Sequence, residues 1–180
     1  MNSERSSTAR FLDEYGDAIG FIGIALLVFA VLQLVYFQFF LESSAFYAYL
    51  TFLAKLSAGL LHLVGEEVTL IEQTLLAPGG ANVTVAEGCD ALRIFSVLVA
   101  AVVAFEATAQ QKASGLVFCI GIMFILNIAR ISGLLWVDIY FPESFDLWHE
   151  TLLPLALWAA AMGCFFVWGS RVVASLPERD

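Results

Sequence analysis

The sequence predicts an all-α integral membrane protein with about four transmembrane helices, an interfacial or re-entrant helix and a small extracytoplasmic β-hairpin. The composition is the main reason for this fold class. Hydrophobic residues make up 61% of the 180 residues and charged residues 14%, and the mean hydropathy is +0.86. Soluble domains are about half apolar and about a quarter charged. The second reason is a series of apolar runs separated by polar loops, and the total length suits one domain.

The first apolar run occupies residues 18–40 and carries no charge. It is long enough to cross a bilayer. It is too long for the core of a signal peptide and its leading flank is acidic as well as basic, so we interpret it as a retained anchor. Residues 1–17 are predicted to form a cytoplasmic tail, residues 18–170 a single membrane-embedded domain, and residues 171–180 a second cytoplasmic tail.

The second apolar run, residues 45–64, is ambiguous. Its more polar and small residues repeat at helical spacing along one side, namely Thr51, Lys55, Ala58 and His62. This stripe favours an amphipathic helix that lies at the interface, or a half-inserted hairpin, over a full crossing.

Residues 65–88 form the main polar loop. Pro78-Gly79-Gly80 is a turn signal. It separates two short runs of residues that favour β-structure, residues 68–70 and 82–85, so the pattern predicts a small hairpin.

The rest of the chain alternates between apolar segments and polar loops. The predicted helices are residues 90–105, 115–137 and 151–169, and the predicted loops are residues 108–114 and 138–148. Polar residues interrupt these helices at Arg93, Asn127 and Arg130.

The distribution of charge predicts the topology. We place the N-terminus inside and let only residues 18–40, 90–105, 115–137 and 151–169 cross. The cytoplasmic side then holds Arg5, Arg10, Lys112, Arg171 and Arg179. The opposite side holds Lys55 together with Glu66, Glu67, Glu72, Glu87, Asp138, Glu143 and Asp146. This is the positive-inside pattern, and a further crossing by residues 45–64 would destroy it by moving Lys112.

Three chemically distinctive residues share one depth in this topology. Cys89 stands at the outer start of one helix and His149 at the outer start of another. Arg130 stands about seven residues below the outer end of its helix, or roughly 10 Å at the helical rise, which a guanidinium on a long stem can snorkel across. The pattern therefore predicts a thiol catalytic site at the outer face of the membrane.

The residue types fit this chemistry. A thiol attacks as its thiolate, which a helix N-terminus or a cation such as Arg93 or Arg130 stabilises. His149 would transfer the proton, and Arg130 would hold the developing oxyanion with Asn127 orienting it. An arginine within a span costs about 2.5–3.5 kcal/mol on insertion scales, which predicts a function for Arg130.

Other interpretations stay open at this point. Arg130 would be structural if it paired with an acidic neighbour, Arg93 would be structural if it only snorkelled, and His62 is a rival base. Cys119 and Cys164 are expected to be small packing residues. We find no metal-ligand cluster, phosphate-binding loop or cofactor motif, and the net charge of -9 argues against nucleic acid as a partner.

Two motifs and a histidine resemble a known family. Cys89-Asp90-Ala91-Leu92-Arg93 resembles the cysteine motif of the exosortase/archaeosortase family, although Asp90-Ala91 replaces the commoner Ser-Gly. Asn127-Ile128-Ala129-Arg130 is similar to that family's Asn-x-x-Arg helix motif, and His149 stands where its later histidine is expected. The matching part covers roughly residues 65–169, and the short chain resembles compact subtypes such as exosortase H.

The resemblance implies a membrane-embedded cysteine protease or transpeptidase with Cys89, Arg130 and His149 as its catalytic residues, supported by Arg93 and Asn127. Its partners would be membrane lipid, an unknown cell-surface acceptor, and exported proteins with a C-terminal motif, an apolar helix and a basic tail. The implied location is the bacterial inner membrane, with the site facing the periplasm. The alternatives are a non-catalytic membrane assembly or transport subunit, and another membrane thiol enzyme such as an acyltransferase.

Overall fold

The computed structural model describes residues 2–175, with side chains from Gly16 onward. Met1 and residues 176–180 lie outside it, as do the side chains of residues 2–15. The predicted tail residues Arg5, Arg10 and Arg179 are therefore not placed. The helices are α1 (Asn2–Val35), α2 (Ser44–Leu63), α3 (Leu92–Ala104), α4 (Ala109–Tyr140), α5 (Phe145–Leu147) and α6 (Leu153–Ala174). Short helical turns are η1 (Tyr36–Phe40), η2 (Pro142–Ser144) and η3 (Trp148–Leu152), and the strands are β1 (Thr69–Ile71), β2 (Thr74–Leu76) and β3 (Asn82–Thr84).

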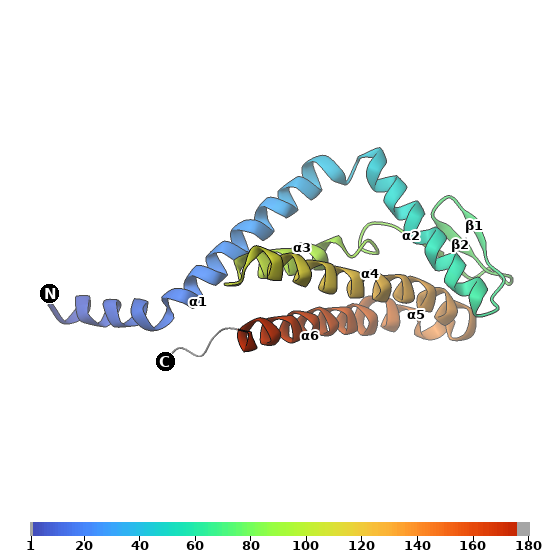
Figure 1. Ribbon diagram of the computed structural model, residues 1–180. Coiled ribbons are helices and arrows are strands. Elements are labelled where there is room, and N and C mark those ends of the chain that lie inside the picture. The colour runs from blue at the N-terminus through green and yellow to red at the C-terminus, as the bar shows by residue number, and fades with distance from the viewer. Residues whose placement is uncertain (1, 176–180) are drawn as a thin grey trace.

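The long helices lie along one axis with both ends of the chain at the same end of the molecule (Figure 1). Helices α3, α4 and α6 pack together, and α1 packs against α3. The sheet and α2 lie at the opposite end, where they cover the C-terminal half of α4. The chain is thus an all-α membrane protein with a small sheet at one end.

Four helices are long and apolar enough to cross a membrane, as expected. By length and composition these are Gly16–Phe40, Ser44–Leu63, Ala109–Tyr140 and Pro142–Ala174. The set differs from the predicted one, because residues 90–105 are helical only over Leu92–Ala104, which is about 20 Å at the helical rise against about 30 Å of hydrocarbon. The helix is shortened because Gly88 and Ala91 take left-handed backbone conformations, with φ of 90° and 58°.

The direction of α2 bears on whether it returns across the membrane. In Figure 1, α1 and α2 both run away from the end that carries the N-terminus, α3 returns toward it, α4 runs away again and α6 returns. A helix that crossed back after α1 would have to run toward the N-terminal end. The helix directions therefore agree with crossings by α1, α3, α4 and α6, and the path of α2 relative to the membrane stays a prediction.

The β-structure has three strands, so the predicted hairpin of residues 68–70 with 82–85 is wrong in its pairing. The strands form an antiparallel sheet in the order β1-β2-β3, with Leu70 opposite Leu75 and Leu75 opposite Val83. A tight turn at Glu72, where φ is 55°, adds β2 between the two predicted strands. The Pro78-Gly79-Gly80 turn does connect two strands, β2 and β3.

The helix ends follow local capping chemistry. Thr108 and Gln111 form a capping box that starts α4 at Ala109, so most of the predicted loop 108–114 is helical. The helix continues to Tyr140, past the predicted end at residue 137. Its length brings its C-terminal half up to the sheet, where the Asp138 carboxylate accepts a hydrogen bond from the Asn82 backbone at 2.8 Å.

Two apolar clusters form the core. One joins α2, the sheet and the outer half of α4, and contains Leu53, Leu61, Leu75, Val85, Leu134 and Cys89. The other joins α3, α4 and α6, and contains Leu98, Val102, Cys119, Met123 and Trp168. Cys119 is fully buried and Cys164 packs against the second cluster, which agrees with their interpretation as packing residues.

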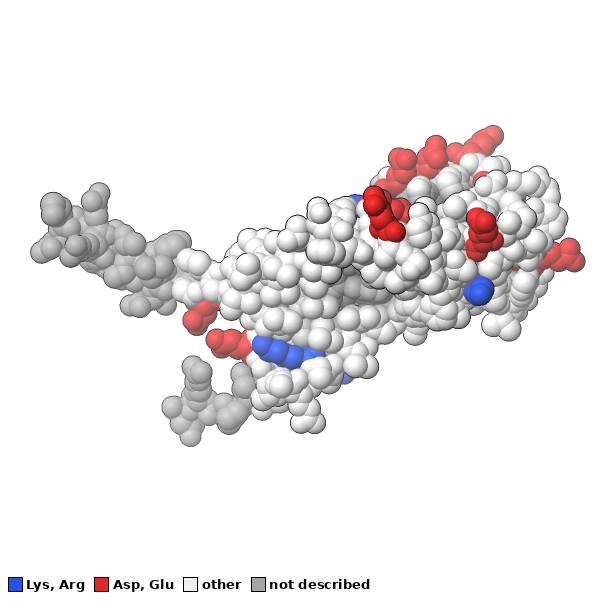
Figure 2. Space-filling model, turned by 90° about the horizontal axis from the view of Figure 1, so that it is seen from above, with Lys and Arg blue, Asp and Glu red and all other residues white. Residues whose placement is uncertain are grey.

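The charges are distributed unevenly between the two ends. Figure 2 shows acidic side chains gathered over the half of this face that lies opposite the N-terminus. Lys112 and Arg171 lie near the other end, in the first turns of α4 and the last turn of α6. This arrangement follows the positive-inside pattern along the axis of the bundle.

Replacing Gly115 with Ala should destabilise the protein by about 1–3 kcal/mol through overpacking. A Cβ atom at Gly115 would collide with the Trp168 ring, which is held in place because its Nε1 donates to the Gln111 carbonyl at 3.0 Å. Thermal melting in detergent micelles measures the effect. Gly121→Ala on the same helix is the control, because a Cβ there meets nothing within 4 Å. Equal melting temperatures for the two variants would contradict this packing.

Candidate functional site

Cys89 lies in the loop between β3 and α3, three residues before the helix starts at Leu92. Its side chain is 5% exposed, and its backbone N–H donates to the Ala86 carbonyl at 3.0 Å. The prediction that the helix begins at Cys89 is wrong, because Asp90 occupies the end of α3 instead. The Asp90 carboxylate accepts a hydrogen bond from the Leu92 backbone N–H at 2.7 Å. The first backbone N–H of α3 is therefore bound by the Asp90 carboxylate and not by the Cys89 sulfur.

Three successive carbonyl groups of this loop each accept a hydrogen bond from a side chain of another helix. Arg130 Nη1 donates to the Gly88 carbonyl at 3.2 Å, and Asn127 Nδ2 donates to the Cys89 carbonyl at 2.8 Å. The Tyr49 hydroxyl donates to the Asp90 carbonyl at 2.8 Å. Because a buried unpaired carbonyl costs about 1–3 kcal/mol, these donors hold the loop in one conformation.

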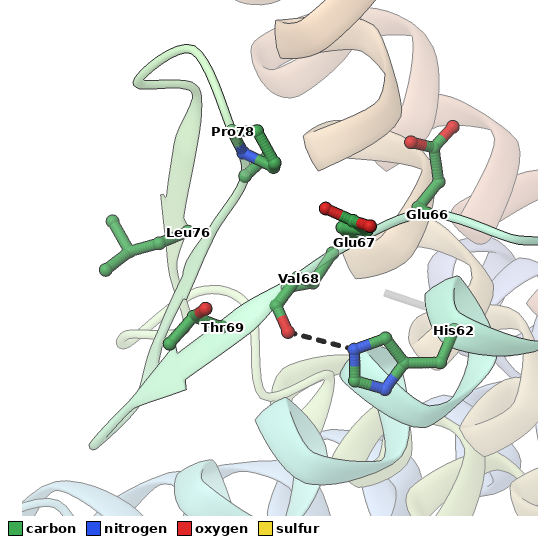
Figure 3. Close-up of a pocket in the computed structure, with 8 residues that line it drawn as sticks. His62, Glu66, Glu67, Val68, Thr69, Leu76 and Pro78 are labelled. Carbon is green, nitrogen blue, oxygen red and sulfur yellow. Dashed lines mark hydrogen bonds between the residues drawn. The ribbon is translucent and has the colours of Figure 1, made fainter.

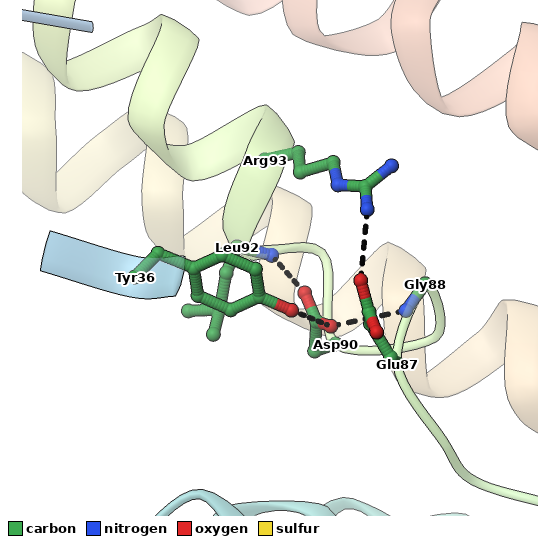
Figure 4. Close-up of polar contacts among 6 residues, drawn as sticks. All are labelled: Tyr36, Glu87, Gly88, Asp90, Leu92 and Arg93. Carbon is green, nitrogen blue, oxygen red and sulfur yellow. Dashed lines mark hydrogen bonds and ion pairs between the residues drawn. The ribbon is translucent and has the colours of Figure 1, made fainter. Parts of the chain in front are cut away.

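The Asp90 side chain folds back onto the backbone of its own loop (Figure 4). Its side chain is 2% exposed. One carboxylate oxygen accepts from the Leu92 backbone, and the other accepts from the Gly88 backbone N–H at 3.1 Å and from the Tyr36 hydroxyl at 3.1 Å. One carboxylate thus binds backbone groups on both sides of Cys89.

The structure brings Asn127 and Arg130 to the cysteine loop. They stand three residues apart on α4, so they lie on one face of the helix. Asn127 is fully buried and Arg130 is 8% exposed. Arg130 Nε and Asn127 Oδ1 are buried and have no hydrogen-bond partner among residues 16–175. Arg130 also makes no salt bridge in that part of the chain, so the alternative of pairing with an acidic neighbour finds no support.

A cavity of about 260 Å³ lies between the cysteine loop, α4 and α6. Its loop and α4 side is formed by Gly88, Asp90, Ala91, Arg93, Ile94 and Arg130, and its α6 side by Pro154, Leu157 and Trp158. Cys89 does not line this cavity, because its side chain belongs to the apolar cluster beneath α2 and the sheet. The arginine therefore faces the cavity, while the sulfur faces the core.

Arg93 does not point toward the cysteine. It makes a salt bridge with Glu87 at 3.0 Å between two half-exposed side chains, and its guanidinium lies 5.8 Å from the centre of the Phe37 ring. Such a pair is worth little, at most about 1 kcal/mol. The geometry gives Arg93 the role of joining the loop to η1 rather than of supporting the thiol.

His149 is the predicted site residue that makes no contact with Cys89 or Arg130. It lies in η3, is half-buried, and stacks on Phe145 with ring centres 5.5 Å apart. It precedes the cavity residue Pro154 by five positions on the same continuous helix, or about 7.5 Å along the axis. His149 is thus near the cavity along the chain but outside its lining.

The rival histidine, His62, has a structural contact instead. Its Nε2 lies 2.9 Å from the Val68 carbonyl (Figure 3), an acceptor that requires this nitrogen to be the donor. It lines a separate cavity of about 550 Å³ with Glu66 and Glu67 beside the sheet. No cysteine lines that cavity, so this larger space is not the predicted thiol site.

Two residues of the site were not predicted. Tyr36 and Tyr49 come from two apolar segments, where a tyrosine is typical of the membrane interface. The available signal was weak: both hydroxyl groups stand within otherwise apolar runs and require partners when they are buried. Asp90 was noted as part of the cysteine motif, but its hydrogen bond to Tyr36 was not foreseen.

The fold and this site define an integral membrane protein in which polar side chains of separate helices hold a buried cysteine loop. The chain matches the family of transmembrane exosortases over residues 15–167. Because this match covers most of the chain, the protein belongs to the exosortase family, which indicates a multi-pass membrane protein with a sorting-related function. Comparison with curated proteins and with solved structures finds no match.

Proposed function

We propose that this protein is a membrane-embedded cysteine protease or transpeptidase. It cleaves the C-terminal sorting signal of exported proteins and transfers them to a cell-surface acceptor. The observation that carries the proposal is the position of Arg130. Its guanidinium is buried beside the cysteine loop, lines the cavity, and keeps Nε free of any partner among the described residues.

The proposed reaction begins when the Cys89 thiolate attacks a backbone carbonyl carbon of the substrate. The carbon–sulfur bond forms as the carbonyl π-electrons move onto oxygen, and the tetrahedral oxyanion then collapses to a thioester with loss of the amine. His149 takes the thiol proton and returns it to the leaving amine. A water molecule or an acceptor nucleophile then attacks the thioester carbonyl carbon. His149 takes the proton of that nucleophile, and the Cys89 sulfur leaves.

Arg130 would stabilise the oxyanion with the guanidinium edge that the loop does not use. One nitrogen, Nη1, already binds the Gly88 carbonyl, and this contact fixes the plane of the guanidinium next to the nucleophile. Preorganised positive charge of this kind acts strongly in a site from which water is excluded.

Catalysis requires two side-chain movements from the described conformation. The Cys89 sulfur lies in the apolar core and must turn toward the cavity, and the His149 ring must leave Phe145 to come within hydrogen-bond reach of it. His149 lies in η3, a π-helical turn, and such turns occur frequently at functional sites. We infer that substrate binding favours both movements.

The proposed location is the bacterial inner membrane, with the site facing the periplasm. The acidic sheet end and the basic Lys112 and Arg171 end support this orientation. Exported proteins with a C-terminal motif, an apolar helix and a basic tail are the proposed substrates. Their basic tail would stay at the end of the bundle that carries Lys112.

A second candidate is a non-catalytic assembly or transport subunit, and one observation favours it. Arg130 and Asn127 both donate to carbonyl groups of the loop, so their burial has a purely structural explanation. The two candidates differ in their need for the Cys89 sulfur: the enzyme requires it as the nucleophile, and the non-catalytic subunit does not require it.

Replacing Cys89 with Ala should abolish processing of a co-expressed exported reporter that carries such a C-terminal tail, because the nucleophile is lost. Membrane insertion should be unchanged, since the side chain is small. Immunoblotting of reporter length measures processing. Cys119→Ala is the matched control, because Cys119 is equally buried in the other core cluster. Processing that survives in Cys89→Ala would exclude the enzyme and leave the structural candidate.

Replacing Arg130 with Lys should lower processing by about 100-fold or more, the usual effect of removing an oxyanion donor. A single ammonium can bind the Gly88 carbonyl but does not reproduce the guanidinium fork. The measurement is the initial rate of reporter cleavage at equal amounts of folded protein. Arg171→Lys is the control at the other end of the bundle. A near-normal rate in Arg130→Lys would remove the oxyanion role.

Replacing His149 with Gln should lower the rate by about 100-fold to 10,000-fold, the contribution of general acid–base catalysis. His62→Gln should retain processing, because a Gln amide can still donate to the Val68 carbonyl. Initial rates of the two variants, measured side by side, decide between the histidines. The reverse order of effects would make His62 the proton carrier.

A further inference from the structure

The first helix is almost wholly unburied except at one residue. Among residues 16–40, Tyr36 alone is buried, at 5% exposure. Its neighbours Phe37 and Phe39 are 47% and 76% exposed. The buried position is the one whose hydroxyl donates to the Asp90 carboxylate. The buried residue at this end of the anchor helix therefore contacts both Phe46 of α2 and the residue that follows the cysteine.

Asp90 collects its hydrogen bonds from three directions. Tyr36 and the Gly88 backbone bind one carboxylate oxygen, and the Leu92 backbone binds the other (Figure 4). No salt bridge to Asp90 occurs among the described side chains. A carboxylate in an apolar environment depends on such donors. The loss of one donor is therefore expected to change the conformation of Asp90 and of the loop backbone that it binds.

The backbone beside the cysteine also depends on this carboxylate. Ala91 has φ of 58° and ψ of 5°, a left-handed conformation that a residue with a side chain adopts only when its surroundings impose it. The Gly88 and Leu92 N–H groups lie on either side of Cys89 and Ala91, and one carboxylate binds both. This bridge sets the direction in which the Cys89 side chain leaves the backbone.

We propose that Asp90 and Tyr36 are positioning residues that fix the backbone at Cys89, about which its side chain turns toward the cavity for attack. Tyr36 joins this backbone to the end of the anchor helix. The proposal rests on the proposed function of Cys89 as a nucleophile. Tyr36 does not line the cavity, and Asp90, which does, has both carboxylate oxygens bound by Tyr36 and by the loop backbone. The loss of either residue should lower the rate of the chemical step, seen as kcat, and leave substrate binding, seen as KM, nearly unchanged.

Asp90→Asn and Tyr36→Phe test the proposal in the full-length protein in membranes. If the NH2 group of the Asn side chain in Asp90→Asn takes the place of the carboxylate oxygen that binds Gly88, it faces the Gly88 N–H, and two donors cannot form a hydrogen bond. The loop should therefore lose its contact with the side chain at Gly88. We expect kcat for reporter cleavage to fall by about tenfold to 100-fold in Asp90→Asn, the effect of misplacing a reactive group by about an ångström. In Tyr36→Phe, which removes one hydroxyl, we expect a fall of about threefold to tenfold for the same reason. Tyr47→Phe is the matched control, because Tyr47 is 56% exposed and its hydroxyl makes no hydrogen bond to the described residues.

Alkylation of Cys89 by iodoacetamide supplies a readout that a general loss of stability does not mimic. It is measured on protein of unchanged melting temperature, in a background in which Cys119 and Cys164 are Ala. A loosened loop exposes the buried sulfur, so the positioning role predicts faster alkylation together with slower processing. If alkylation and processing both slow, Asp90 acts on the reactivity of the thiol itself and the positioning role is wrong.

The remaining outcomes are also decisive. If Asp90→Asn does not fold, Tyr36→Phe alone decides, and a kcat equal to that of Tyr47→Phe overturns the proposal. If Cys89→Ala is inactive while Asp90→Asn and Tyr36→Phe process normally, the proposed function stands and the positioning role fails. If Cys89→Ala itself processes the reporter, the proposed function fails first.

Discussion

The structure depends on satisfying the backbone of the cysteine loop in apolar surroundings. Residues 88–91 are not helical, and the last three of them, Cys89, Asp90 and Ala91, are buried. Such a backbone is tolerated at membrane depth only where protein groups bind it. Arg130, Asn127 and Tyr49 bind the three carbonyls, and Asp90 binds two N–H groups. The most polar side chains of the interior are therefore arranged around a four-residue segment.

This constraint explains why the polar residues could be located from the sequence while the loop could not. An arginine and an asparagine inside an apolar helix need a polar partner, and the cysteine motif was the one polar helix boundary within their reach. Their convergence followed from charge and helical spacing. The left-handed Ala91 has no such signal, because alanine strongly favours helix, and so the helix was predicted to begin too early. Tyr36 and Tyr49 were missed because a tyrosine near the end of an apolar run is equally typical of the interface.

The same reasoning separates the accurate parts of the fold from the inaccurate ones. Long apolar runs determine the number of candidate spans, and the basic residues determine the direction of the bundle. The sheet depended on short-range detail: the turn at Glu72 created β2 from a three-residue run, Thr74–Leu76, that has little periodicity of its own. Pairing in such short strands is set by their turns and by the core beneath them. Here that core includes Leu75 and Val83, which are directly opposite each other.

Arg130 binds the Gly88 carbonyl of the loop and also lines the cavity. The shape of the guanidinium allows both. A guanidinium carries five N–H donors in a rigid plane, so the Nη1 bond to Gly88 fixes the orientation of the others without using them. Arg130 Nε is buried and has no partner among the described residues, and a buried donor of this kind gains most from a ligand that supplies an acceptor. A lysine in its place would have to choose between the carbonyl and the ligand. The hydrogen bond that holds the loop thus also fixes the plane of the Arg130 guanidinium. If Arg130 binds the oxyanion as proposed, a change in loop conformation would also change that binding.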